Sequence, residues 1–350
     1  MRVVVTGATG NVGTSVLQAL AGDERVREIV GVARRLPRWS TPRTTWAQAD
    51  VAADDLEPLF RGADAVVHLA WLIQPSRDQV ELERVNVHGS RRVFEAAARA
   101  GPRALVHASS VGVYAPGPKD RRVDESHPRD GIPTSFYSRH KAAAERALDD
   151  VEARNPQLRV VRLRPGLTFK REAAAEIRRL FAGPLLPRGL MRPALIPIVP
   201  ATPRLALQAV HSHDVGEAYR LAVTSPQARG AYNIAAEPVL DPPELGRLLH
   251  ARPVPIPPRA LRAGAALSWR LHLQPTPPGW VDMGLEIPLM DTTRARDQLG
   301  WTPRHSAGDA LLELLEGMRS AAGLDTPTLA PDVAGPLRVR ELLSGVGRKP

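Results

Sequence analysis

Apolar residues in this chain gather in short runs that alternate with stretches of helical periodicity. The pattern predicts strands at residues 3–5, 28–33, 44–49, 65–69, 104–108 and 159–164. Most of these runs are continuously apolar and rich in β-branched residues, which is typical of strands buried on both faces of a parallel sheet. Helical stretches such as 14–21 and 80–100 lie between them. The alternation predicts an α/β fold with a doubly wound parallel sheet.

A glycine-rich turn follows the first strand directly. Gly7, Gly10 and Gly13 have the spacing G-x-x-G-x-x-G and precede the first helix. Gly7 permits a tight turn, Gly10 lets the backbone approach a pyrophosphate, and Gly13 lets helix and strand pack closely. The free N–H groups at the helix N-terminus would face the phosphates. A turn that needs positive φ would also select glycine, but the position after a strand favours a dinucleotide site.

The end of the second strand indicates which dinucleotide is bound. It carries Arg34 and Arg35, and no acidic residue lies between Gly31 and Trp39. An acidic residue here would hold the adenosine ribose hydroxyls, whereas arginine accommodates a 2′-phosphate. The sequence therefore predicts a preference for NADP(H), with NAD(H) as the alternative cofactor. A pair of surface arginines without such a role is the other interpretation.

A tyrosine and a lysine one helical turn apart are the candidate catalytic pair. Pro133, Thr134 and Ser135 supply helix start signals, and strong helix formers follow, so Tyr137 and Lys141 should share one helix face. A phenol titrates near about 10, and a neighbouring ammonium would favour its anion. The pair would then serve as a proton donor or acceptor. A chance pairing is the alternative.

In order along the chain, these stretches resemble the extended short-chain dehydrogenase/reductase family, in its NAD-dependent epimerase/dehydratase branch. The resemblance runs from Met1 to about Pro303. The matching segments are T-G-x-x-G-x-x-G at 6–13, Asp50-Val51, His68-Leu69-Ala70, S-S-x-x-V-Y at 109–114, Y-x-x-x-K at 137–141, R-P-G at 164–166 and L-G-W-x-P at 299–303.

The resemblance implies a Ser-Tyr-Lys site at the carboxyl edge of the sheet. Ser110 would be the serine, because it lies four residues before Tyr114, although Ser109 or Ser110 could also simply bond the turn. Asn86 would lie near this site, or present its amide to solvent. The resemblance also implies a set of cofactor contacts besides Tyr137 and Lys141: Gly7, Thr9, Gly10, Asn11, Val12, Gly13, Arg34, Arg35, Asp50, Val51, Leu69, Ala70 and Pro165. Asp50 could instead cap the short helix expected around residues 54–60.

The resemblance also suggests how the chain is divided. We expect a Rossmann-type NAD(P)-binding domain at 1–166, to which 205–224 returns. A smaller C-terminal substrate lobe would comprise 167–204 and 225–320. A tail at 321–350 contains several prolines and is expected to be partly disordered. The family's habit of pairing through two helices per subunit implies that a homodimer can form.

Departures from the family pattern narrow the reaction. Dehydratases of the family carry Thr-Asp-Glu where this chain has Ser110-Val111-Gly112, and many epimerases carry an Asn and a Tyr-Gly-Pro where it has residues 165–169. Together with Arg34 and Arg35, this favours an oxidoreductase that moves hydride between NADP(H) and a carbonyl or secondary alcohol of a small molecule. A sugar or sugar-nucleotide epimerase with retained NAD is the main alternative. A dinucleotide sensor without catalysis would not need the Tyr-Lys pair.

Composition excludes several other classes. The net charge is +10, but only four of the 47 basic residues are lysines and the arginines are scattered, so nucleic-acid binding is not expected. Prolines and arginines in the apolar stretch 184–201 argue against a membrane helix. There is no cysteine and no leader pattern, which favours a cytoplasmic protein. His211 and His213 lack a third ligand nearby in sequence, so no metal is expected. His68, inside a buried strand, is expected to be a core residue.

Overall fold

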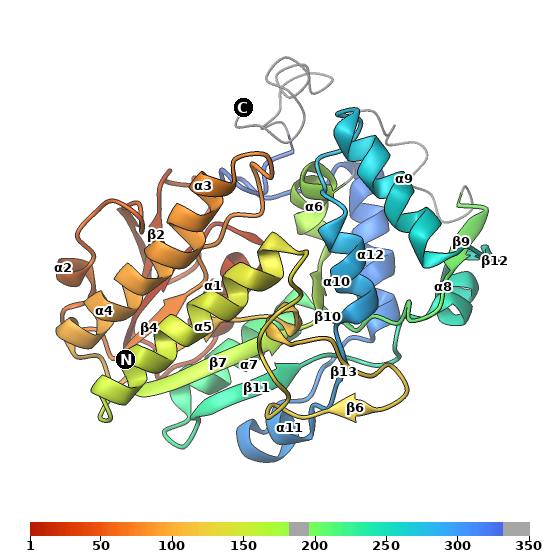
Figure 1. The fold of residues 1–350 in the computed structure, drawn as a ribbon. Helices are drawn as coiled ribbons and strands as arrows, with labels where there is room; N and C mark the ends of the chain where they lie inside the picture. Colours follow the sequence, from red (N-terminus) through yellow and green to blue (C-terminus); the bar gives the residue numbers. More distant parts are fainter. Residues whose placement is uncertain (182–195, 332–350) are drawn as a thin grey trace.

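The computed structural model describes residues 1–181 and 196–331, and its centre is a parallel sheet of seven strands (Figure 1). The strand order is β11-β7-β5-β4-β1-β2-β3. This order reverses direction next to β1, as in a Rossmann fold, and so places a ligand crevice beyond the carboxyl end of that strand. The strands are β1 (Arg2–Thr6), β2 (Glu28–Ala33), β3 (Thr44–Gln48), β4 (Ala65–His68), β5 (Ala104–Ala108), β7 (Arg159–Pro165) and β11 (Gly230–Ile234).

Helices cover both faces of this sheet. Val3 and Val5 of β1 point into a core shared with α1 (Asn11–Ala21), α7 (Ser212–Thr224) and α11 (Thr293–Leu299). Val4 points to the opposite face and packs in a second core with α4 (Ser90–Ala100) and α5 (Phe136–Arg154). Successive side chains of a strand alternate between faces, which explains why the central strands are apolar throughout. The predicted α/β fold is confirmed.

The smaller lobe lies to one side of the sheet, around α8, α9, α10 and α12 (Figure 1). Three short parallel pairs of strands belong to it or border it: β8 with β10, β9 with β12, and β6 with β13. Their bounds, with those of the remaining α-helices, are β6 (Arg122–Val123), β8 (Leu167–Phe169), β9 (Ile198–Ala201), β10 (Ala209–His211), β12 (Arg252–Pro255), β13 (Leu289–Met290), α2 (Glu57–Phe60), α3 (Gln79–Glu83), α6 (Ala174–Phe181), α8 (Pro242–Leu249), α9 (Pro258–Arg270), α10 (Gly279–Glu286) and α12 (Ala307–Ser320).

Strand β11 lies elsewhere than the sequence suggests. Residues 225–320 were expected in the substrate lobe, yet β11 pairs with β7 at the edge of the main sheet. Its Tyr232 and Ile234 are buried in the same core as β1, and this burial explains the placement. The division of the rest of the chain into two domains stays a prediction.

The described part of the tail is packed rather than loose. Thr326 is 2% exposed and Leu329 is fully buried. The expectation of partial disorder otherwise concerns residues 332–350, which lie outside the described residues, as does most of the proline-rich stretch 184–201. No helix of the described chain is long and apolar enough to cross a membrane.

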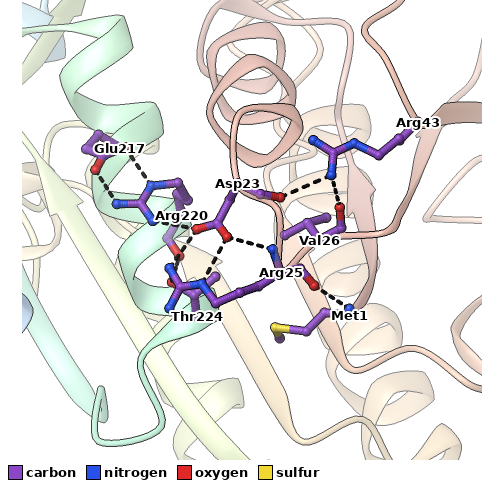
Figure 2. Close-up of polar contacts among 8 residues, drawn as sticks. All are labelled: Met1, Asp23, Arg25, Val26, Arg43, Glu217, Arg220 and Thr224. Atoms are coloured by element: carbon purple, nitrogen blue, oxygen red, sulfur yellow. Dashed lines mark hydrogen bonds and ion pairs between the residues drawn. The ribbon is translucent and has the colours of Figure 1, made fainter.

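An ion cluster joins the end of α1 to α7 (Figure 2). Asp23 accepts hydrogen bonds from Nε and Nη2 of Arg25 at 2.9 and 2.6 Å and from Nη1 of Arg220 at 2.6 Å. Arg220 also pairs with Glu217, one turn earlier on α7. The hydrogen bond from Arg25 is the largest effect on the pKa of Asp23 and lowers it, and the bond from Arg220 lowers it further. Burial acts in the opposite direction, but the pKa stays well below its usual range. The carboxylate therefore stabilises the contact between the two helices.

Candidate active site

The glycine turn has the close contacts that its sequence predicts. Gly7 has φ +72°, and a Cβ there would lie 2.5 Å from the backbone nitrogen of Ala70. A Cβ on Gly13 would lie 2.4 Å from the carbonyl oxygen of Gly7. Gly10 is different, because its nearest neighbour would be 3.7 Å away. Two of the glycines are thus required by packing, and Gly10 leaves open space beside the N-terminus of α1.

The first helix begins at Asn11, three residues earlier than predicted, so its free N–H groups lie at the glycine turn. The Asn11 side chain donates to the carbonyl oxygen of Thr168 at 2.9 Å, and the Glu176 carboxyl group of α6 lies near the backbone amide of Asn11. Burial raises the pKa of Glu176 to about 7. Val12 packs against the core of the sheet. An acidic side chain therefore lies where the helix N-terminus would meet a phosphate.

The described tail covers the other side of the glycine turn. Thr326 Oγ1 donates to the carbonyl oxygen of Thr9 at 2.9 Å, and the hydroxyls of Thr9 and Thr328 are 3.1 Å apart. The backbone N–H of Trp39, beyond β2, donates to the carbonyl of Asp325 at 3.0 Å. Sequence reasoning missed this contact, because the segments are some three hundred residues apart.

At the predicted adenosine end, Arg34 and Arg35 are exposed just after β2. Asp50 Oδ1 accepts from the backbone N–H of Ala52 at 2.9 Å, so part of its carboxylate bonds its own turn. The expected alternative, a cap on the short helix, is not found, since α2 begins at Glu57 after Leu56. Val51 is buried in the core, and only its backbone can face a ligand.

The remaining predicted cofactor contacts lie at strand ends around the crevice. Leu69 follows β4, and its backbone N–H donates to the carbonyl of Thr6 at 3.0 Å. Ala70 packs against Gly7. Pro165 ends β7. All three come from the carboxyl edge of the sheet, where ligands bind in open α/β folds.

Ser110, Tyr137 and Lys141 come together at the same edge. Ser110 follows β5, and its hydroxyl interacts with the phenol of Tyr137 and accepts the backbone N–H of Gly112 at 3.0 Å. Ser135 caps α5, accepting the Ser138 backbone N–H at 3.3 Å, so Tyr137 and Lys141 lie on the first two turns.

The pKa values of this group differ from the sequence expectation. Burial raises the pKa of Tyr137, and the Ser110 hydroxyl acts against that rise. The Lys141 Nζ lies 5.7 Å from the centre of the Tyr137 ring and donates to the carbonyl of Ala108 at 2.7 Å. Burial lowers the pKa of Lys141 to about 7, so at neutral pH only about half of these side chains carry the charge that would stabilise a phenolate. The predicted lowering of the Tyr137 pKa was therefore wrong for the protein alone.

Two tryptophans that the sequence did not single out enclose the pair. Trp71, in the loop after β4, places its ring centre 3.4 Å from Lys141 Nζ and its plane nearly perpendicular to Tyr137. Trp280 of α10 lies 4.9 Å from the Tyr137 ring, centre to centre. Both come from segments without a recognisable motif. They cover the candidate proton donor, Tyr137, with apolar surface.

Asn86 fixes the loop that carries Trp71. Its side chain accepts from the backbone N–H of Leu72 at 2.7 Å and donates to the Leu72 carbonyl at 2.8 Å. The amide is fully buried, so the outward, solvated alternative was wrong. Asn86 lies in a π-helical turn, residues 84–89, that interrupts the helix expected over 80–100. Such turns are frequent at functional sites.

A buried ion pair supports the site from behind. Glu145, one turn after Lys141, accepts from Nε and Nη2 of Arg164 at 2.9 and 2.6 Å. The hydroxyl of Ser109 donates to the same carboxylate, and Arg164 Nη1 donates to the Tyr114 hydroxyl at 3.0 Å. This network joins β5, α5 and β7 directly beneath Ser110.

His68 and His211 have hydrogen-bond partners within the protein. His68 lies between the hydroxyls of Thr6 and Ser90, at 2.7 and 2.9 Å, which confirms it as a core residue. His211 meets His305 and Glu313, two potential ligands that the sequence spacing did not reveal. However, His211 Nδ1 accepts the backbone N–H of His213 in the first turn of α7 at 3.2 Å, which leaves Nε2 to donate to Glu313 at 3.1 Å.

Comparison with known proteins identifies the family. The model of the NAD dependent epimerase/dehydratase family matches residues 3–235. An uncharacterised protein of Mycobacterium tuberculosis is 26% identical over 332 residues, which is 94% of this chain and 31% of that protein. The chain thus spans about a third of the length of the first curated relatives it matches. A 4-hydroxy-2-methyl-3-oxo-4-farnesyl-3,4-dihydroquinoline-1-oxide ketoreductase of Stigmatella aurantiaca is 30% identical over 193 residues, 51% of this chain and 54% of the relative.

Solved structures show the same fold. UDP-glucose 4-epimerase of Thermus thermophilus in complex with NAD has a TM-score of 0.65 at 22% identity, covering 92% of this chain and 100% of its own. The dTDP-glucose 4,6-dehydratase DesIV of Streptomyces venezuelae, with NAD bound, has a TM-score of 0.66 at 20% identity, covering 91% of this chain and 97% of its own.

Proposed function

Because this chain belongs to the NAD-dependent epimerase/dehydratase family, and so is an NAD(P)-dependent enzyme, we propose that it is an oxidoreductase that prefers NADP(H). Its substrate would be a small molecule with a carbonyl or secondary alcohol group. The observation that carries the proposal is the meeting of Ser110, Tyr137 and Lys141 beside the glycine turn. Cytoplasmic location and a homodimer stay predictions.

The glycine turn fits a dinucleotide. Gly7 and Gly13 hold the backbone close to β4 and β1, while Gly10 leaves space in which a diphosphate can approach the N-terminus of α1. Arg34 and Arg35 would receive a 2′-phosphate. Glu176 would leave the Asn11 amide when a diphosphate binds there, because two anions cannot share it. The bound cofactor would supply or accept hydride at its nicotinamide ring.

The chain's own residues would handle the proton. In reduction, the Tyr137 hydroxyl gives its proton to the substrate oxygen while the Ser110 hydroxyl hydrogen-bonds that oxygen; oxidation reverses the transfer. Lys141, four residues further along α5, would hold the nicotinamide ribose. If Lys141 is protonated when it holds the ribose, its positive charge would favour the phenolate form of Tyr137. Trp71 and Trp280 limit access of water to these groups.

Two features favour net reduction over epimerisation. No acidic residue follows β2 to hold the ribose hydroxyls of a retained NAD, and two exposed arginines stand there instead. The relative from Stigmatella aurantiaca is named as a ketoreductase. The epimerase is the alternative that the cofactor measurements distinguish.

Substitution of the tyrosine tests the proposed chemistry. Tyr137→Phe should abolish turnover and leave NADPH affinity within about twofold, because it removes one hydroxyl and keeps the ring. Unchanged turnover would refute the site. A non-catalytic sensor would show cofactor binding without turnover in either form.

Substitution of the arginines tests cofactor preference. Arg34→Asp with Arg35→Ala should weaken NADPH binding at least tenfold more than NADH binding, since the charge contacts involve the 2′-phosphate. Equal losses for both cofactors would contradict the preference. The exposed Arg38→Ala, on the same loop, is the matched control.

A further inference from the structure

An apolar pocket opens next to the proposed proton donor. Its volume is about 630 Å³, within the range usual for sites that bury a small organic ligand. It lies between α9 and α10, with Phe181 at the end of α6 as a further wall. Trp280 links it to the site, since this ring lines the pocket and its centre also lies 4.9 Å from the centre of the Tyr137 ring.

The walls of this pocket carry no charge. Leu261, Ala265 and Val281 are typical of the side chains that line it, and none of its described lining residues is acidic, basic or histidine. Binding a diphosphate here would remove its water without an ionic partner, which is strongly unfavourable. Burial of hydrocarbon would instead be favourable, at about 25 cal/mol for each Å².

Three polar side chains of the pocket, Ser268, Gln274 and Thr276, are already hydrogen-bonded within the protein, whereas the buried Nε1 of Trp280 has no hydrogen-bond partner among the described residues. Gln274 donates to the Thr276 carbonyl at 2.7 Å and to Ser268 Oγ at 3.2 Å. Its carbonyl oxygen accepts from both the backbone N–H and the hydroxyl of Thr276. Ser268 Oγ donates to the carbonyl of Ala265 at 3.1 Å. A ligand that brought polar groups to this wall would have to break these bonds.

We propose that the substrate is an apolar carbonyl compound with a hydrocarbon or aromatic body of about bicyclic size, seated in this pocket with its carbonyl directed past Trp280 towards Tyr137. This inference rests on the proposed function. In reduction the carbonyl carbon gains hydride from NADPH, the oxygen gains the Tyr137 proton, and the alcohol and NADP⁺ are the products. A sugar nucleotide does not match the pocket.

A neighbouring hollow provides the contrast. It is lined by Arg77 and Arg139 among others, and it shares Pro277 with the apolar pocket. Arg77 stacks on Trp269, with its guanidinium carbon 4.3 Å from the ring centre, and Arg139 Nη1 donates to the Pro133 carbonyl at 2.7 Å. A nucleotide sugar would have to bind in this charged hollow. The UDP-glucose titration described below shows whether such binding occurs.

The test compares apolar ketones with a sugar nucleotide on the whole protein. Dissociation constants for 1-tetralone, benzophenone, 2-decanone and UDP-glucose are measured by ligand-observed NMR, and NADPH oxidation is followed separately. At least one ketone should bind and UDP-glucose should not. Ala265→Glu, which places a carboxylate in the pocket, should weaken ketone binding at least tenfold. Ala263→Glu is the matched control on the exposed face of α9 and should leave binding unchanged.

The outcomes separate this inference from the proposed function. Failure of all three ketones to bind, binding of UDP-glucose, or ketone binding that Ala265→Glu does not weaken would overturn the substrate class. Ketone binding that responds to Ala265→Glu, without NADPH oxidation, would support the pocket and count against the proposed chemistry. Circular dichroism of both variants checks that they are folded.

Discussion

Replacing Glu145 with glutamine should destabilise the protein strongly. Glu145 is fully buried and Arg164 is 2% exposed, and two hydrogen bonds of 2.9 and 2.6 Å join them. Glu145→Gln keeps the size of the side chain but removes its charge, so the Arg164 guanidinium stays buried without a counterion at these distances. Breaking one partner of such a pair costs about 3–5 kcal/mol. Because an amide oxygen can still accept one bond, we expect a loss near about 3 kcal/mol in the free energy of unfolding.

Urea unfolding followed by circular dichroism measures this loss. A cost of about 3 kcal/mol would be a large part of the total stability of about 5–15 kcal/mol that is typical of folded domains. Glu316→Gln is the matched control, because its partner Arg319 is on the same exposed helix face and both side chains are nearly half exposed. It should show no measurable change. If Glu145→Gln is as stable as the control, the buried pair does not support the site as argued.

Three further predictions concern the glycine turn and its surroundings. Gly13→Ala should lower the melting temperature, since its Cβ would lie 2.4 Å from a backbone oxygen. Gly10→Ala should leave the melting temperature unchanged but weaken NADPH binding at least tenfold. Thermal melts and cofactor titrations check both variants, and equal stability of the two would contradict the packing argument. Glu176→Gln should tighten NADPH binding above pH 7, because the carboxyl group, with its pKa of about 7, is charged there and repels a diphosphate. NADPH titrations at pH 6 and 8.5 test this. If the substitution leaves the affinity unchanged at both pH values, Glu176 does not have this role. Asp23→Asn should lower the free energy of unfolding by about 1–3 kcal/mol at neutral pH. Because folding lowers the pKa of Asp23, the carboxylate's stabilising effect is complete above about pH 4 and fades below it. Urea unfolding should therefore show that the stabilities of the variant and the natural protein converge in acid.

The sheet and the positions of the candidate catalytic residues were predictable because their signals are local. Short apolar runs such as 28–33 that recur between helical stretches are interpreted as buried strands of a parallel sheet. The glycine-rich turn follows the first of these strands directly. Ser110, Tyr137 and Lys141 each belong to a short motif in a fixed order. The family resemblance therefore predicts from the sequence that they lie at one edge of the sheet.

What surrounds the site was not predictable, because it depends on tertiary contacts. Trp71 comes from the loop after β4, and Trp280 and Glu176 come from α10 and α6. Nothing in their immediate sequence indicates which side chain they approach. Burial also changed the expected chemistry: it lowers the pKa of Lys141, so the predicted stabilisation of a Tyr137 phenolate is weakened in the protein alone. Periodicity predicts which residues are buried, but it does not predict the free-energy cost of burying a charged group or the pKa shift that results.

The account depends most directly on an exchangeable NADP(H). The decisive measurement is the titration of the purified protein with NADPH and NADH, followed by nicotinamide fluorescence, after chromatography has checked for nicotinamide that co-purifies. The account predicts no retained cofactor and NADPH binding at least tenfold tighter than NADH binding, through Arg34 and Arg35. Stoichiometric NAD that remains bound through purification would contradict it and would favour the epimerase.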